Sequence, residues 1–281
     1  MIYPNRLKPL TIDVISVQSQ VAYGHVGNSV AFPTLYSQGH EVVVVPTVLF
    51  SNVPHYDTLS GGPLPQEWFE GFLSDIERRG LLESAPAVLI GYLGSAEQAR
   101  ALAAWLERVT AHYPEMQVIL DPVMGDYDSG SYVAPGVPAA LRDLLVPLAT
   151  GMSPNAYEFE QIVGRETRTA AATVEAAREL LSGRKEWVVV TSAAPDESGE
   201  DELRIVIVTR EGEEWLSFDR VNSAAKGTGD MFTAALLGYR LKGYGLREAV
   251  GTAHGDVARV LERTARLERA ELVLSEMTPD R

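Results

Sequence analysis

The chain has 281 residues, with 24 Lys and Arg against 38 Asp and Glu, a net charge of −14, and no cysteine. The absence of cysteine excludes disulfides, thiolate zinc sites, iron–sulfur ligation and cysteine nucleophiles. The acidic balance disfavours nucleic-acid binding, because no local basic patch offsets it. The first thirty residues lack a signal-peptide pattern, and no apolar run is long enough to cross a bilayer. We therefore expect a cytoplasmic protein with neither a nucleic-acid nor a membrane partner.

Strand-like and helix-like segments alternate along the chain, as apolar β-branched runs give way to helical periodicity. In chain order we expect a strand at 11–17, a helix at 27–37, a strand at 41–48, a helix at 65–79, a strand at 87–92, a helix at 96–112, strands at 118–121 and 150–152, a helix opening near 155, a helix at 170–181, a strand at 187–191, and helices at 229–242 and 246–267. Residues 203–209 and 214–218 alternate as an antiparallel pair, joined by a tight turn at Glu211-Gly212. The acidic stretch 195–202 is expected to be a solvated hairpin loop.

Repeated strand–helix–strand units predict an α/β fold of three α/β/α layers, with a mostly parallel central sheet, helices on both faces and one antiparallel β-pair. A single domain over 1–281 is expected, because no Pro/Ser/Gly-rich linker divides the chain. Residues 1–8 and 278–281 are expected to be loose ends. In open α/β sheets ligands bind beyond the carboxyl ends of the strands, so residues that follow strands are the first site candidates.

The segment Gly227-Thr228-Gly229-Asp230 stands at the start of an apolar helix. Two glycines around one small residue let backbone amides converge, and the helix adds unpaired N–H groups and a positive dipole end. Such an anion hole beside a carboxylate suggests phosphoryl transfer, with Asp230 accepting a hydroxyl proton. The same residues also suit an ordinary helix start that Asp230 merely caps, and the motif alone does not decide.

Two further carboxylates follow predicted strands. Asp121 ends the 118–121 strand before a Pro-fixed turn, where it can attract Mg²⁺ or simply form a turn. Asn155 and Glu158 lie three residues apart after the next strand and share one helix face. They suit a capping box, which is compatible with Glu158 also facing a metal-bound water.

The order and wording of these motifs resemble the pyridoxal kinases of the ribokinase-like superfamily over roughly 12–261, and the bacterial PdxY-type enzymes in particular. GTGD and Asn-x-x-Glu belong to the wider superfamily, whereas the first segment, Phe-Ser-Asn and Gly-Tyr-Leu-Gly-Ser are more specific. The matching segments are VQSQVAYGHVGNSVAFP (17–33), TVLFSN (47–52), GYLGSAEQ (91–98), DPVMGD (121–126), YVAPG (132–136), SPNAYEFE (153–160), VVVTS (188–192) and GTGD (227–230).

The resemblance implies a ribokinase-like fold and ATP-dependent phosphorylation of the 5′-hydroxymethyl group of pyridoxal, and of pyridoxine or pyridoxamine, in vitamin B6 salvage (EC 2.7.1.35). Asp230 would be the general base, and Gly227, Thr228 and Gly229 the anion hole. Asp121 and Glu158 would organise Mg²⁺ and the ATP phosphates, largely through water. Family members commonly use a monovalent cation, K⁺ or Na⁺, and form homodimers.

The resemblance also assigns further binding positions. On the ATP side these are Ser153, Asn155, Thr191 and Ser192 near the phosphates, Arg220 and Val221 against the nucleotide, and Tyr132 in a lid that closes over ATP. On the side of the vitamin B6 form (the vitamer) they are Ser19, Val26, Pro54, His55 and Tyr92.

The chain departs from the family pattern on the vitamer side. Gln20 replaces a usual histidine, and Val53-Pro54 replaces the usual His-Thr. A threonine hydroxyl is therefore missing, and Pro54 lacks even a backbone donor. His55 takes over that role one position along, or the register shifts. Lys226, at a position more often apolar, is expected to be solvated.

Three other functions fit parts of the pattern. A kinase of a hydroxymethylpyrimidine is the first, because Pro54 departs from the pyridoxal pattern, although 17–33 and 91–98 favour pyridoxal. A sugar kinase fits less well, since the first segment replaces a sugar site. A vitamin- or nucleotide-binding protein without turnover is the third, and the intact Asp121, Glu158 and Asp230 disfavour it.

Overall fold

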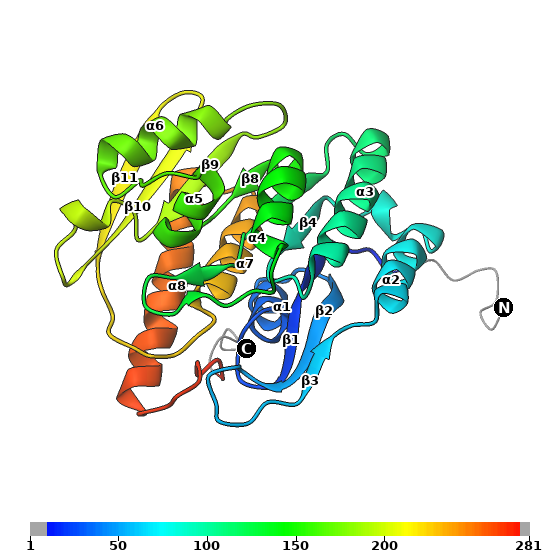
Figure 1. Ribbon diagram of the computed structural model, residues 1–281, viewed down its shortest axis with the longest axis horizontal. Coiled ribbons are helices and arrows are strands. Elements are labelled where there is room, and N and C mark those ends of the chain that lie inside the picture. Colours follow the sequence, from blue (N-terminus) through cyan, green and yellow to red (C-terminus); the bar gives the residue numbers. More distant parts are fainter. Residues whose placement is uncertain (1–9, 276–281) are drawn as a thin grey trace.

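The computed structural model describes residues 10–275, and the predicted loose ends 1–8 and 278–281 lie outside them. One sheet of nine strands forms the centre, in the order β11-β10-β9-β8-β5-β4-β1-β2-β3 (Figure 1). Its strands are β1 (Val14–Tyr23), β2 (Val42–Asn52), β3 (Gly61–Pro63), β4 (Ala87–Ile90), β5 (Gln117–Leu120), β8 (Gly151–Met152), β9 (Trp187–Thr191), β10 (Glu202–Thr209) and β11 (Glu213–Asp219). The six strands from β9 to β2 are parallel, and β3, β10 and β11 are antiparallel to their neighbours.

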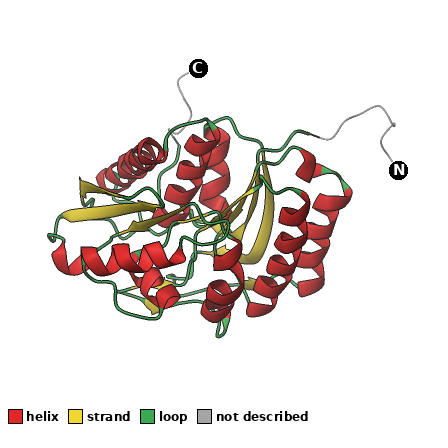
Figure 2. Ribbon diagram, turned by 90° about the horizontal axis from the view of Figure 1, so that it is seen from above, coloured by secondary structure: helices red, strands yellow, loops and turns green. Residues whose placement is uncertain are grey.

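Helices cover both faces of the sheet, as the view from above shows (Figure 2). One face packs against α1 (Asn28–Ser37), α7 (Thr228–Leu241) and α8 (Leu246–Arg266). The other packs against α2 (Gln66–Arg78), α3 (Ala96–His112), α4 (Val137–Ala140), α5 (Ala156–Val163) and α6 (Ala170–Leu180). Each face has its own apolar core, so the three-layer α/β/α prediction is confirmed.

The helices form where local sequence favours them. The hydroxyl of Ser95 accepts a hydrogen bond from the amide of Gln98 at the start of α3. In α8 the residues that face the core recur every three or four positions. They are Ala249, Val250, Ala253, Val257, Val260 and Thr264.

Several elements differ from their predicted bounds. Strands β1 and β2 continue to Tyr23 and Asn52, because each pairs with the other along its whole length, with a register shift between Gln18 and Gln20. The prediction omits β3, the hairpin of β6 (Gly125–Asp126) and β7 (Gly130–Ser131), and a helical run from Val137 to Leu148. It also omits the short 3₁₀ turns Leu81–Glu83 and Pro195–Glu197. These elements are too short or too irregular to show a clear periodicity, and contacts with other parts of the fold determine where they form.

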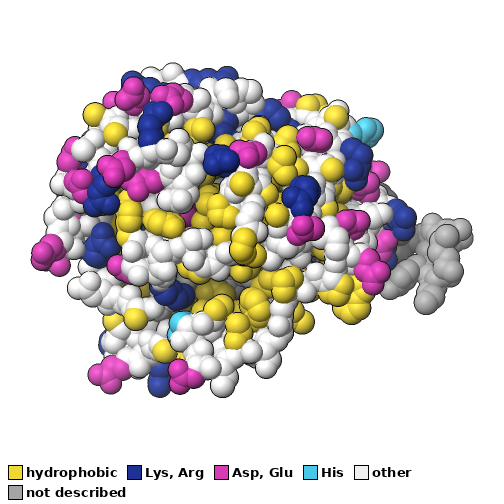
Figure 3. All heavy atoms as spheres, in the orientation of Figure 1, with side chains coloured by type: hydrophobic (Ala, Val, Ile, Leu, Met, Phe, Trp, Pro, Cys, Tyr) yellow, Lys and Arg dark blue, Asp and Glu magenta, His cyan; other side chains and the backbone are white. Residues whose placement is uncertain are grey.

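The antiparallel pair is confirmed, since β10 and β11 run side by side with Ile205 opposite Leu216 and a turn at Gly212. The acidic loop connects β9 to β10, which pair antiparallel, as a hairpin loop should. Acidic and basic side chains are interspersed over the face drawn in Figure 3. Among residues 10–275, no helix combines the length and apolar composition that a membrane span requires.

Candidate active site

Three carboxylates meet beyond the carboxyl ends of the central strands. Asp121 follows β5, Glu158 lies in the first turn of α5, and Asp230 in the first turn of α7. Burial raises the pKa of Asp121 well above its usual value, and the charges of Glu158 and Asp230 raise it further. Burial likewise raises the pKa of Glu158 to about 7 and that of Asp230 to about 6. Burial and mutual repulsion therefore disfavour the ionised forms of these carboxyl groups.

Asp230 does not cap its own helix. Gly227 is the N-cap of α7, no side chain caps this end, and Asp230 instead takes a hydrogen bond from the amide of Gly27. Its Oδ1 is buried without a hydrogen-bond partner. The start of α7 thus combines backbone amides that no side chain caps with a carboxylate oxygen that has no partner, which are the two components of an anion hole beside a proton acceptor.

Gly227 is essential to this geometry. Its φ is +94°, and a Cβ at this position would lie 1.9 Å from the carbonyl oxygen of His25. The turn before α7 therefore packs directly on the loop that follows β1. That loop contains Gly27, so one contact positions both the anion hole and the amide that binds Asp230.

Asn155 and Glu158 form the predicted capping box. The Asn155 side chain accepts from the Glu158 amide at 2.9 Å, and Glu158 accepts from the Asn155 amide at 2.9 Å. Glu158 also accepts from the amide of Met124 at 3.0 Å, and Asn155 Nδ2 donates to the carbonyl of Gly125 at 2.9 Å. These bonds fix the segment after Asp121 against α5, so capping and site assembly use the same residues.

Two hydroxyl groups, linked by hydrogen bonds, hold the side chain of Asp121. Thr233 Oγ1 donates to Asp121 Oδ2 at 3.1 Å and lies 2.7 Å from Ser153 Oγ. Ser153 is therefore engaged with Thr233 at the base of the cluster. Sequence reasoning missed Thr233, although its position three residues after Asp230 puts both on one face of α7.

The hairpin β6–β7 packs against α5, the helix that carries Glu158. Tyr132 follows this hairpin and is 49% exposed; its partial burial raises the pKa of its hydroxyl, and the charges of Glu158 and Asp230 add to this. The Tyr132 amide donates to the carbonyl of Met124 at 3.0 Å. Lys226 forms an ion pair with Asp126 of this hairpin at 3.3 Å, so it is not simply solvated as expected. This pair ties the hairpin to the loop before α7.

The predicted nucleotide-side residues lie along β9 and the loop after β11. Thr191 ends β9, where it bridges to Asn155, and Ser192 follows with a φ of +50°. The Arg220 amide donates to the carbonyl of Asp201 at 2.7 Å, which holds the start of its loop. Val221 is the next, half-buried residue.

The vitamer-side residues gather around the ends of β1, β2 and β4. Ser19 is buried in β1, and a Cβ on Gly27 would lie 2.1 Å from its hydroxyl oxygen. Val26 and Tyr92 are half-buried and follow β1 and β4 in the chain. Burial raises the pKa of the Tyr92 hydroxyl.

The two residues that replace the usual His-Thr, Val53 and Pro54, differ in their exposure. Val53 turns inward and is 3% exposed, whereas Pro54 is exposed. His55 is the next side chain able to hydrogen bond, and its Nε2 lies 3.4 Å from Glu271 Oε1. Glu271, in the segment after α8, was not singled out from the sequence.

Comparison with known proteins places the chain in a family. The family model described as phosphomethylpyrimidine kinase matches residues 81–274. The pyridoxine/pyridoxal/pyridoxamine kinase of Bordetella pertussis is 48% identical, over 97% of this chain and 96% of that protein. The pyridoxal kinase PdxY of Rubrobacter xylanophilus is 37% identical, over 94% and 91%. This chain belongs to the pyridoxal kinase family.

A solved relative agrees with the fold. Pyridoxal kinase from Leishmania donovani in complex with ADP and pyridoxine superposes with a TM-score of 0.84 at 26% identity, covering 94% of this chain and 92% of that one. The predicted ribokinase-like architecture is thus confirmed. The Bordetella enzyme has a name that covers three vitamers. By sequence identity, this chain is more similar to that enzyme than to the Rubrobacter PdxY enzyme.

The carboxylate cluster of this pyridoxal kinase homologue fits a hydrated divalent cation. None of the ion pairs that the structure shows for residues 10–275 involves Asp121, Glu158 or Asp230. The same part of the chain has no group of three or more side chains able to enclose a metal. Two buried carboxylates without a cationic partner suit Mg²⁺, which keeps several waters and binds one or two carboxylates.

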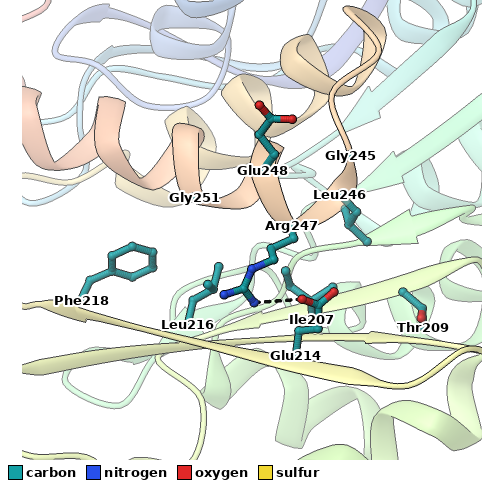
Figure 4. A pocket seen from close by; sticks show the side chains of 10 residues that line it. All are labelled: Ile207, Thr209, Glu214, Leu216, Phe218, Gly245, Leu246, Arg247, Glu248 and Gly251. Carbon is teal, nitrogen blue, oxygen red and sulfur yellow. Dashed lines mark hydrogen bonds and ion pairs between the residues drawn. The ribbon is translucent and has the colours of Figure 1, made fainter.

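A second groove lies away from this cluster. It has a volume of about 560 Å³ and runs between the β10–β11 hairpin and the start of α8, from Thr209 to Phe218 (Figure 4). An ion pair of 2.9 Å joins Arg247 to Glu214 across it. Thr209 pairs with Trp187 at the start of β9, so this end of the groove lies opposite the carboxyl edge.

Raised carboxyl pKa values predict how the ligand-free protein responds to pH. Because Asp121, Glu158 and Asp230 keep protons that the unfolded chain releases, their contribution to the free energy of unfolding falls as pH rises from about 4 to about 7. Asp121→Asn removes one of the repelling charges. We expect its Tm to exceed that of the unaltered protein, with a difference that grows between about pH 5 and 8.

Thermal unfolding without ATP or Mg²⁺, at several pH values, measures this effect. Asp128→Asn is the control, because Asp128 is exposed and outside the cluster. A Tm difference for Asp121→Asn that does not change with pH would contradict the assigned repulsion.

Proposed function

We propose that this chain phosphorylates the 5′-hydroxymethyl group of pyridoxal, pyridoxine and pyridoxamine with ATP, which makes it a vitamin B6 salvage kinase. The observation that carries the proposal is Asp230, whose buried unpartnered oxygen lies at the uncapped start of α7. Family membership and the names of the relatives support the vitamer as substrate. The range of three vitamers follows the name of the Bordetella enzyme.

The proposed reaction is a direct transfer. The vitamer hydroxyl oxygen bonds to the γ-phosphorus as the bond to the ADP oxygen breaks, and Asp230 accepts the hydroxyl proton. With a pKa of about 6, Asp230 is mostly ionised at neutral pH and can take that proton. The amides of Gly227, Thr228 and Gly229 stabilise the charge on the moving phosphoryl group.

The co-substrate and ion assignments rest on the site residues. Asp121 and Glu158 would hold Mg²⁺ largely through water, and Mg²⁺ would supply charge neutralisation of the ATP phosphates. ATP as co-substrate is supported by the Leishmania relative, which is in complex with ADP. The residues proposed to contact ATP are Asn155, Ser153, Thr191, Ser192, Arg220, Val221 and Tyr132. A K⁺ or Na⁺ requirement, a homodimer and a cytoplasmic location are further proposals, which rest on the family resemblance.

The vitamer pocket is proposed to comprise Ser19, Val26, Tyr92 and His55, with Pro54 at its rim. Pro54, which is exposed, stands where the family has a threonine and offers no hydrogen-bonding side chain. His55 is the next residue and can supply a hydrogen bond in its place. We infer that Val53-Pro54 in place of His-Thr affects vitamer preference and leaves phosphoryl transfer intact.

The proposal is tested by ATP- and Mg²⁺-dependent product formation with pyridoxal, pyridoxine, pyridoxamine and the hydroxymethylpyrimidine of thiamin synthesis in parallel. We expect turnover of all three vitamers and at least about tenfold lower kcat/KM for the pyrimidine. Preference for the pyrimidine would replace the vitamer proposal with the function named by the matching family model. Binding of vitamer and ATP without ADP release would instead indicate a binding protein.

A further inference from the structure

A buried carboxylate outside the catalytic cluster joins three distant segments of the chain. Glu271 belongs to the segment after α8, which returns toward the loops of β1 and β2 (Figure 1). Its side chain is 9% exposed. The neighbouring Leu272 packs into the core on the α7–α8 face, and the Val273 amide donates to Thr264 Oγ1 at 3.0 Å. The segment is therefore anchored, so that Glu271 is held in a defined place.

One carboxylate oxygen of Glu271 faces the loop after β2. Its Oε1 accepts from the hydroxyl of Tyr56 at 2.7 Å and lies 3.4 Å from Nε2 of His55. The His55 and Tyr56 rings are in contact, with centroids 4.3 Å apart. This hydrogen bond raises the pKa of the Tyr56 hydroxyl, so Tyr56 stays a donor to Glu271.

The other oxygen faces the loop after β1. A Cβ on Gly24 would lie 2.6 Å from Glu271 Oε2, which is buried without a hydrogen-bond partner. The charge of Glu271 also acts on His25, whose pKa is lowered mainly by burial and raised in part by this carboxylate. The carbonyl of His25 in turn lies against Gly227, so the loop after β1 that Glu271 contacts also packs on the turn before α7.

We propose that Glu271 is a positioning residue for vitamer binding that acts through His55. It holds Nε2 of His55 and the hydroxyl of Tyr56, which leaves Nδ1 of His55 as the ring nitrogen that meets the polar edge of the vitamer. A carboxylate close to one imidazole nitrogen favours a proton on that nitrogen, and this determines which partner the second nitrogen accepts. The inference rests on the proposed function and on His55 in its pocket.

The test is a comparison of KM and kcat in single and double variants. Glu271→Gln keeps the size of the side chain and removes its charge, and we expect KM for pyridoxal to rise about tenfold with kcat and KM for ATP nearly unchanged. Glu268→Gln, in the same segment but exposed, should change neither parameter. His55→Ala should also raise KM for pyridoxal about tenfold.

The double variant separates positioning from a merely structural role. If Glu271 acts through His55, Glu271→Gln adds little to the KM of His55→Ala. Multiplying effects, an unchanged KM in Glu271→Gln, or a fall in kcat alone would overturn the proposal. Should Glu271→Gln not fold, Tyr56→Phe replaces it in the same cycle, with the same outcomes. An unaltered protein that turns over no vitamer defeats the proposed function, whereas an active protein with an unaffected Glu271→Gln variant defeats only this inference.

Discussion

Asp230→Asn should lower kcat with pyridoxal by about 10²–10⁴-fold while ATP still binds. Asparagine keeps the shape of the side chain and can still accept the hydrogen bond from the Gly27 amide, but it cannot take the hydroxyl proton. Steady-state kinetics and equilibrium ATP binding measure the two effects separately. The fall in kcat/KM below about pH 6, which the raised pKa of Asp230 predicts for the unaltered protein, should also disappear.

A matched control for this variant is Asp126→Asn, which removes a carboxylate of the hairpin that is paired with Lys226. It should change kcat far less, because Asp126 is tied to a lysine and outside the proposed proton path. Near-normal turnover by Asp230→Asn would rule out the base role, and equal losses in both variants would point to a general effect of charge.

Gly227→Ala is expected to have the second large effect, a fall in kcat of about 10²-fold or more. A methyl group here would lie 1.9 Å from the carbonyl of His25, so the turn before α7 and the loop after β1 must move apart. That movement shifts the amides of the anion hole and the Gly27 amide that binds Asp230. Kinetics with pyridoxal, together with a Tm measurement, test this expectation.

Gly243→Ala separates the clash from backbone strain. Gly243 has a φ of +89°, close to the +94° of Gly227, but a Cβ there would meet nothing within 4 Å. Both variants should lose about 1–2 kcal/mol of stability from the left-handed conformation. Only Gly227→Ala should lose turnover, and retained activity in that variant would contradict the proposed anion hole.

The geometry of the proposed catalytic motifs could be predicted because each motif is local. Gly227 to Asp230 are contiguous, and Asn155 and Glu158 are one helical turn apart, so spacing alone predicts their geometry. The alternation of strands and helices likewise predicted the layers and the edge of the sheet where the carboxylates meet. The capping interpretation of Asp230 was left open, and the structure decides against it because the hydrogen bond to its carboxylate comes from the loop after β1.

The short and irregular elements could not be predicted in the same way. The β6–β7 hairpin pairs only Gly125 and Asp126 with two residues, so its sequence has no strand periodicity. Strand β1 extends past its apolar run because β2 supplies hydrogen-bonding partners as far as Asn52. Pairing with a distant segment, and not local propensity, sets such bounds.

The sequence by itself determined the fold class and the family, and it suggested the proposed catalytic residues, since all depend on patterns within a few turns of chain. Only the tertiary structure decided which distant side chains support them. Tyr56 and Glu271 are 215 positions apart, Asp121 and Thr233 are 112 apart, and Asp126 and Lys226 are 100 apart. Contacts of this kind depend on the order of strands in the sheet and on the return of the chain after α8, and no local pattern encodes either.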